Sequence, residues 1–183
     1  MPKPTLTLCL LALLTSCYPG RNRGLDPSRP SFNTTDASVL FFRNVRSPYY
    51  DPEEMPEAGL RVYRLGRRVQ DDGRPLLNLA IVHNWRRDQA FILIEPGDYI
   101  MGLPEVRIRY RNAERGTSGE LVYEPGSREE QFRTATAIYL QIEAGSEFAL
   151  LAWDEEIAFL SEKTERDAFR TTMFDFYRLV ELQ

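Results

Sequence analysis

Hydrophobic and polar residues alternate along much of this chain with a period of two, which is the pattern of half-buried β-strands. The alternation is clearest at 105–111, where Val106, Ile108 and Tyr110 alternate with three arginines. Short strands separated by turn residues are typical of antiparallel sheets. We therefore expect strands at 38–45, 59–65, 76–85, 89–95, 105–111, 120–124, 131–143, 147–153 and 156–160.

The period changes near the C-terminus. Apolar residues recur there at spacings of four, three and four, which places them on one face of a helix over about 165–181. We expect this face to pack on the sheets, although a docking helix for another protein would have the same spacing. The predicted fold for 37–183 is mainly β: an antiparallel β-sandwich with a C-terminal α-helix packed on it. The apolar face consists of Phe169, Met173, Phe176 and Val180.

The N-terminus has the layout of an export signal. Residues 6–14 form an apolar run of nine residues. A helix of that length spans about 14 Å, roughly half of a bilayer core of about 30 Å, so it is too short to cross a membrane. The run ends at Leu14-Thr15-Ser16-Cys17, which resembles the bacterial lipobox. An ordinary cleaved signal with a stray cysteine is the alternative.

The lipobox resemblance implies that residues 1–16 are a lipoprotein signal peptide and that Cys17 is acylated and becomes the mature N-terminus. Tyr18 follows the cysteine, where many lipoproteins retained in the inner membrane have aspartate. In a host with two membranes this favours the outer membrane, with the domain facing the periplasm. Residues 17–36 are polar and rich in proline and glycine, which predicts a flexible tether between the lipid and the domain.

Three fragments resemble small envelope lipoproteins with transthyretin-like β-sandwich domains. They are FILIEPGDY (91–99), YLQIEAGSEF (139–148) and the opening LFFR (40–43). The resemblance implies a β-sandwich that binds or braces other proteins, and it implies no enzymatic activity.

Composition narrows the possible ligands. Without residues 1–16 the chain has 22 basic and 27 acidic residues, which argues against nucleic acid as a partner. Cys17 is then the only cysteine and His83 the only histidine, so we expect no disulfide, no zinc or copper site and no cofactor. The acidic loop 51–57 could hold calcium, but a solvated loop is the simpler interpretation.

No nucleophile motif or other catalytic signature is present, so we expect a protein that is not an enzyme. Two sets of residues are candidates for binding. Tyr49, Tyr50 and Trp85 are aromatic residues placed near loops, where they could stack on a sugar, contact a protein or plug the end of the sandwich. Arg107, Arg109 and Arg111 form a ladder on one strand face that could bind anions, unless Glu120 and Glu124 on the next strand neutralise it.

The expected function is that of a lipid-anchored accessory or scaffold protein of the cell envelope. The lipid would anchor the protein in the membrane, and the loop end of the sandwich or the C-terminal helix would bind another envelope protein. A glycan- or glycolipid-binding module is the alternative, and a carboxylate-dependent hydrolase is the third hypothesis.

Overall fold

The computed structural model describes residues 29–70, 73–103, 106–152 and 155–182. The predicted signal peptide, Cys17 and the first part of the tether lie outside the described residues, so their interpretation stays a prediction. Within the described part of the chain, no helix is both long enough and apolar enough to cross a membrane.

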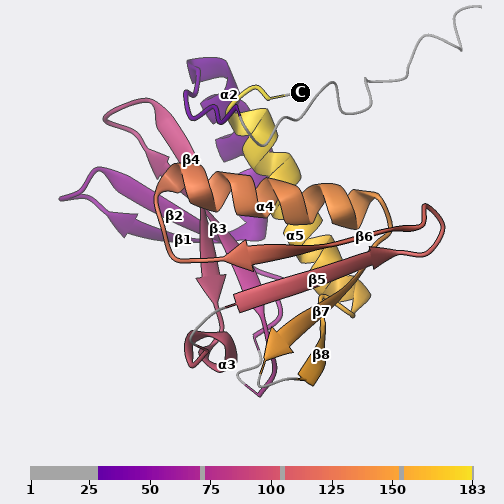
Figure 1. Ribbon diagram of the computed structural model, residues 1–183. Coiled ribbons are helices and arrows are strands. Elements are labelled where there is room, and N and C mark those ends of the chain that lie inside the picture. Colours follow the sequence, from indigo (N-terminus) through magenta and orange to yellow (C-terminus); the bar gives the residue numbers. More distant parts are fainter. Residues whose placement is uncertain (1–28, 71–72, 104–105, 153–154, 183) are drawn as a thin grey trace, which may run out of the picture.

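Two antiparallel sheets of four strands each make up the domain (Figure 1). The first sheet has the order β1-β2-β3-β4 and the second the order β6-β5-β7-β8. The strands are β1 (Tyr50–Met55), β2 (Leu60–Leu65), β3 (Leu77–Asn84), β4 (Gln89–Pro96), β5 (Val106–Asn112), β6 (Thr117–Tyr123), β7 (Glu147–Ala152) and β8 (Glu155–Phe159). The helical segments are α2 (Asp36–Phe41), the π-helix η1 (Phe42–Arg46), the 3-10 turn η2 (Ser47–Tyr49), α3 (Asp98–Met101), α4 (Arg128–Glu143) and α5 (Lys163–Leu179).

The expected fold is confirmed in its coarse features, the antiparallel sheets and the C-terminal helix. Seven of the nine expected strands are present, as β2 to β8. The other two segments, 38–45 and 131–143, are helices, so the chain is a mixed fold rather than the mainly β fold that the pattern predicts.

The prediction of a strand at 38–45 is wrong because a capping box starts a helix just before it. The Thr35 hydroxyl accepts a hydrogen bond from the Ser38 amide, and the Ser38 hydroxyl accepts one from the Thr35 amide. Of the apolar run that follows, only Phe42 is buried, whereas Leu40 and Val45 are exposed. An apolar run that looks like a buried strand is therefore an amphipathic helix with exposed apolar residues.

The prediction of a strand at 131–143 is wrong for a similar reason. Ser127 and Glu130 form a capping box at the start of α4. The buried residues then follow helical spacing, which local alternation in the sequence concealed: Phe132, Ala135, Thr136, Ile138, Tyr139 and Ile142.

The acidic loop predicted at 51–57 is mostly the edge strand β1. Its carboxylates pair with arginines rather than gathering around a cation. Asp51 pairs with Arg68 at 2.9 Å and Glu53 with Arg64 at 2.6 Å. Among the described residues, no group of three or more potential metal ligands lies together.

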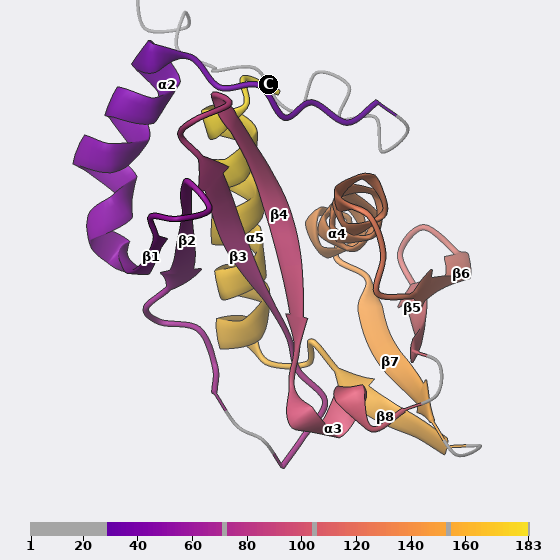
Figure 2. The ribbon, with the colours of Figure 1, turned by 90° about the vertical axis from the view of Figure 1, so that its left-hand side faces the viewer.

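One hydrophobic core draws on both sheets and on both long helices. Figure 2 shows α4 between the sheets, where it contacts β4 and β6, and α5 behind β3 and β4. The four residues of the predicted apolar face of α5 are all buried, so the packing of the C-terminal helix on the sheet is confirmed. The helix starts slightly earlier than predicted, with Glu162 as its N-cap.

Residues 32–34, which the sequence prediction assigns to the tether, lie against β4. The amide of Ala90 donates to the carbonyl of Phe32 at 2.7 Å, and the amide of Thr34 donates to the carbonyl of Asp88 at 2.8 Å. The Phe32 ring packs edge-on against Phe132 of α4, with 6.1 Å between ring centroids. Residues 32–34 therefore pack on the domain and are not part of a flexible tether.

Candidate functional site

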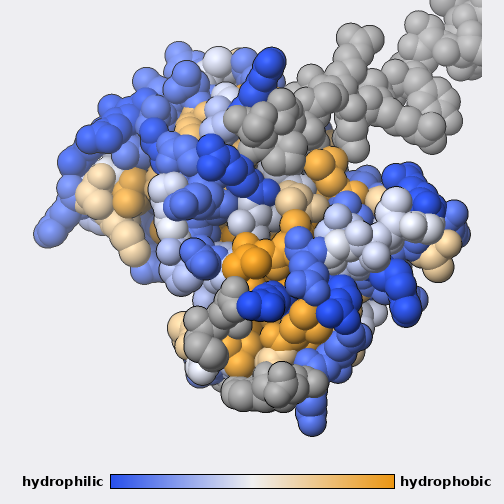
Figure 3. Space-filling view, in the orientation of Figure 1, coloured by the Kyte–Doolittle hydropathy of each residue, from blue (hydrophilic) through white to orange (hydrophobic). Residues whose placement is uncertain are grey.

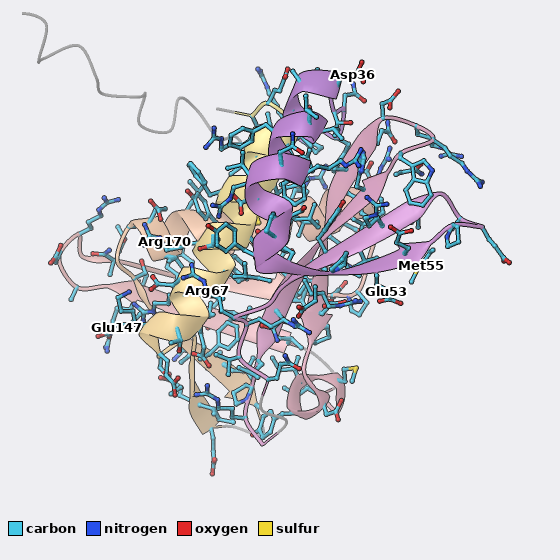
Figure 4. All side chains as sticks on the ribbon, turned by 180° about the vertical axis from the view of Figure 1, so that it is seen from behind. Asp36, Glu53, Met55, Arg67, Glu147 and Arg170 are labelled. Atoms are coloured by element: carbon cyan, nitrogen blue, oxygen red, sulfur yellow. The ribbon has the colours of Figure 1, made fainter. Side chains whose placement is uncertain are left out.

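A cleft of about 420 Å³ opens beside the C-terminal helix. Three parts of the chain meet there: η1 and η2, the end of β2 with the turn that follows it, and the middle of α5. Figure 4 shows Arg67 next to α5, with Arg170 further along the same helix. The cleft is lined by Arg46, Tyr49, Leu65, Gly66, Arg67 and Thr171.

A buried ion pair ties these elements together at the base of the cleft. The guanidinium of Arg46 donates two hydrogen bonds to the Asp175 carboxylate, from Nε to Oδ1 at 2.7 Å and from Nη2 to Oδ2 at 2.9 Å. The Tyr50 hydroxyl donates to Asp175 Oδ2 at 2.7 Å. Asp175 is only 1% exposed, so all of its charge is compensated by groups inside the protein.

The pKa values of this group follow from its burial and charges. Burial, followed by the nearby Asp175 carboxylate, raises the pKa of Tyr50 well above its usual range, so this hydroxyl stays protonated and continues to donate. The hydrogen bonds to Asp175 raise the pKa of Arg46, which keeps its charge. The network therefore fixes η1, β1 and α5 relative to one another.

The rim of the cleft carries an aromatic ring and a second arginine. Tyr49 is 62% exposed, and the guanidinium carbon of Arg46 lies 5.2 Å from the centre of its ring. Arg67 donates from Nη2 to the Thr171 hydroxyl at 2.8 Å, which holds its guanidinium over the cleft. The amide of Gly66 donates to the Tyr49 carbonyl oxygen at 2.9 Å, which holds the turn after β2 against η2.

The elements that border this cleft carry exposed apolar residues. Arg178 of α5 stacks on Phe41 at 4.2 Å and on Phe174 at 5.7 Å, which joins α2 to α5 at the surface. We call this surface the α2–α5 side. The elements from α2 to η2, together with α5, carry four of the eight large hydrophobic side chains that are exposed among the described residues: Leu40, Val45, Tyr49 and Phe174.

The structure separates the three aromatic residues predicted as one binding surface. Only Tyr49 lies at the cleft. Tyr50 is buried at 5% exposure, so its interpretation as an exposed binding residue is wrong. Trp85 follows β3 at the opposite end of the first sheet, since Tyr50 pairs with Leu65 at one end of β2 and Asn84 with Leu60 at the other. Trp85 is 37% exposed, with the guanidinium of Arg61 5.8 Å from its ring.

The arginine ladder lies on β5 of the second sheet, away from the cleft. The predicted pairing with Glu120 is present for one ladder residue, Arg109, whose guanidinium lies 3.0 Å from that carboxylate. Glu124, the other predicted partner, lies beyond the end of β6. Its place is taken by residues of β7 and β8: Arg109 also pairs with Glu156, and Arg111 lies 3.6 Å from Glu147.

The third ladder residue has apolar neighbours. Arg107 lies opposite Val122 on β6 and Leu151 on β7. Hydrophobic and hydrophilic side chains are accordingly mixed on the face that carries β5 and α4 (Figure 3). A continuous basic surface is therefore not formed along the ladder.

His83 lies in β3 and is 8% exposed, as expected for a partly buried histidine. Burial lowers its pKa, and the positive charge of Arg61 lowers it further. Its imidazole is therefore neutral at physiological pH.

Four residues of the site were not found from the sequence: Arg46, Arg67, Thr171 and Asp175. Arg46 directly follows the segment 38–45 that was predicted as a strand, and Arg67 is one of 21 arginines. Asp175 did carry a signal, since it is an acidic residue beside Phe176 on the apolar side of a helix.

A comparison of the chain with protein-family models, with curated proteins and with solved structures finds no match.

Proposed function

We propose that this chain is a lipid-anchored protein of the cell envelope that binds another envelope protein on its α2–α5 side and carries out no catalysis. The observation that carries the proposal is an arginine-lined cleft with Tyr49 exposed on its rim and Phe174 exposed on the helix that borders it. Isolated apolar residues on a surface are ordinary, whereas a cluster around a concave site is typical of binding surfaces.

The chemistry of the cleft suits a protein partner. Tyrosine and arginine are enriched among the residues that dominate protein–protein binding energies. The α2–α5 side presents Tyr49 and Phe174 as rings, and Arg46, Arg67 and Arg178 lie beside them. The rings supply apolar area, and the guanidinium groups can pair with acidic residues of the partner.

The rigid base of the cleft supports the same interpretation. The Arg46–Asp175 pair and the Tyr50 hydroxyl hold η1 on α5, so Tyr49 needs little reordering when a partner binds. A preorganised surface loses less conformational entropy on association than a flexible one.

We also propose a more specific fold class for the domain than two antiparallel sheets with helices. The main hydrophobic core draws on both antiparallel sheets, with α4 between them, which supports a β-sandwich-like arrangement in which α4 fills part of the space between the sheets and α5 braces the first sheet. The glycan-binding alternative needs Tyr49, Tyr50 and Trp85 on one surface, and the burial of Tyr50 removes its platform. We therefore favour the protein partner.

Two experiments test the proposal. For the anchor, labelled palmitate should enter the native chain and not the Cys17→Ala variant. Incorporation into both proteins would contradict lipidation at Cys17.

For the binding surface, a photo-crosslinking amino acid is placed at Phe174 or, as the control, at Val122 on β6. The two side chains are similarly exposed, at 49% and 47%. In the native cells we expect a discrete protein adduct from position 174 only. Equal adducts from both positions, or adducts with lipid alone, would contradict a protein-binding α2–α5 side.

A further inference from the structure

We infer that the cleft receives a carboxylate of the partner protein, bound by the Arg67 guanidinium, with the adjoining apolar part of the partner against the Tyr49 ring. The inference rests on the proposed function and deepens it by naming the chemical group that enters. It follows from the hydrogen-bonding capacity of Arg67, the charge balance of the cleft and its size.

The guanidinium of Arg67 has N–H donors that are not used in hydrogen bonds among the described residues. A guanidinium carries five N–H donors in a planar fork that matches a carboxylate. Within the described part of the chain, Arg67 makes one hydrogen bond, to the Thr171 hydroxyl, and no ion pair. That bond uses one Nη2 donor and orients the fork, which leaves further donors directed away from Thr171.

The charge balance favours a group with a single negative charge. The guanidinium groups of Arg46, Arg67 and Arg68 lie at or beside the cleft, and the carboxylates of Asp175 and Asp51 pair with the first and the third of them. The Asp51 carboxylate is close to the cleft, since one of its oxygens lies 3.5 Å from the Cβ position of Gly66. Asp167 is a further carboxylate within electrostatic range of Arg67, but it pairs with Lys163 and Arg170, so no carboxylate of the described residues forms an ion pair with Arg67. A carboxylate balances the charge of Arg67, whereas a doubly charged phosphate would exceed it.

The size of the cleft fits a side chain rather than an ion. At about 420 Å³ it has many times the volume of about 30 Å³ that one water occupies in the liquid. Leu65 and the Tyr49 ring provide apolar surface beside the guanidinium. An acidic residue next to an aromatic or aliphatic one would fill both parts of the site.

The test uses ligand-observed ¹⁹F NMR on the full chain in nanodiscs of uncharged lipid. The first probe is acetyl-(4-fluoro-Phe)-Glu-amide, and the second is the same peptide with Gln, which keeps the shape and removes the charge. The third is acetyl-(4-fluoro-Phe) with a free carboxylate, which represents a chain terminus.

We expect the Glu probe to bind at least about ten-fold more tightly than the Gln probe, as a charge-assisted bidentate contact should provide. Arg67→Gln should abolish this difference. Arg111→Gln makes the same charge change on the second sheet and should preserve it. Thr171→Val should weaken binding of the Glu probe several-fold, because Arg67 loses its orienting hydroxyl. Tighter binding of the third probe would assign the carboxylate to a chain terminus and would still support the inference.

Equal binding of the Glu and Gln probes would overturn the inference, as would an unchanged preference in Arg67→Gln. Tighter binding of 4-fluorophenyl phosphate than of every carboxylate probe would also overturn it. Arg67 and Thr171 lie at the surface of the cleft, so unchanged melting temperatures should verify that both variants fold. Failure of this test leaves the crosslink at position 174 unaffected, so it can be told apart from failure of the proposed function.

Discussion

Phe176 and Phe174 lie two residues apart on α5 and should respond in opposite ways to replacement by alanine. Phe176 is fully buried and packs near Phe132, with 6.2 Å between ring centroids. Phe174 is 49% exposed on the α2–α5 side. The pair therefore separates the two roles that we assign to this helix, packing on the sheet and presenting a surface.

The magnitudes follow from burial. Removing a fully buried phenylalanine costs about 3–5 kcal/mol of unfolding free energy. For a chain of this size each kcal/mol lowers the melting temperature by about 2–4 °C, so Phe176→Ala should lower it by about 6–20 °C. Phe174→Ala loses a cation–π contact with Arg178 worth about 0.5–1 kcal/mol and should lower the melting temperature by about 4 °C at most.

Differential scanning calorimetry of residues 18–183 measures both effects. All buried hydrophobic residues of the described chain lie between Phe32 and Val180, so this fragment retains the whole core. Phe176→Ala should melt far below the parent while keeping binding at temperatures where it is folded, and Phe174→Ala should melt near the parent and lose partner binding. A shift below about 2 °C for Phe176→Ala, or equal shifts for both variants, would refute the assignment of the two faces.

Two further predictions concern buried polar groups. Asp175→Asn leaves the Arg46 guanidinium without its charge partner; because Arg46 is 27% exposed, we expect a loss of about 2–4 kcal/mol, somewhat below the value for a fully buried pair. Urea denaturation measures this loss, and a change below about 1 kcal/mol would mean that the pair contributes little. The pKa of His83 is lowered by folding, so the unfolded chain binds the proton more readily and stability should fall as the pH drops below about 6.5. The melting temperature should therefore decrease more between pH 7.5 and 5.5 in the parent than in His83→Gln, and parallel decreases would contradict this.

Local pattern predicted most of the sheets and the C-terminal helix correctly. Strands such as 105–111 alternate cleanly because one face is buried and the other is charged. The stripe from Phe169 to Val180 is equally clear, because only one side of α5 meets the core. In both cases the period of burial is visible in the sequence itself.

The pattern failed where helices are apolar on more than one side. In α2 and η1, Leu40 and Val45 are apolar although they are exposed, so the sequence of this run resembles a strand buried on both faces. In α4, both sheets lie nearby and the helix is buried around much of its circumference, which weakens the helical period. The capping boxes at Thr35 and Ser127 were the available signals.

The cleft could not be predicted because long-range packing assembles it. Arg46 and Asp175 are 129 positions apart in the chain. Nothing local to either residue indicates their pairing, and that pairing is what brings Tyr49 next to Thr171. Tyr49 was identified from the sequence as a candidate binding residue, whereas Arg46 and Arg67 could be assigned to the cleft only once the fold was known.

The central claim is that the α2–α5 side is covered by a protein in the cell envelope. Hydroxyl-radical footprinting tests it by comparing side-chain oxidation in intact native cells with oxidation of the purified chain anchored in lipid vesicles. We predict that Tyr49 and Phe174 are protected in cells and reactive in vesicles, whereas Trp85 and Met101 react equally in both. Equal reactivity of Tyr49 and Phe174 in the two preparations would contradict the claim, and so would their protection by the vesicles alone.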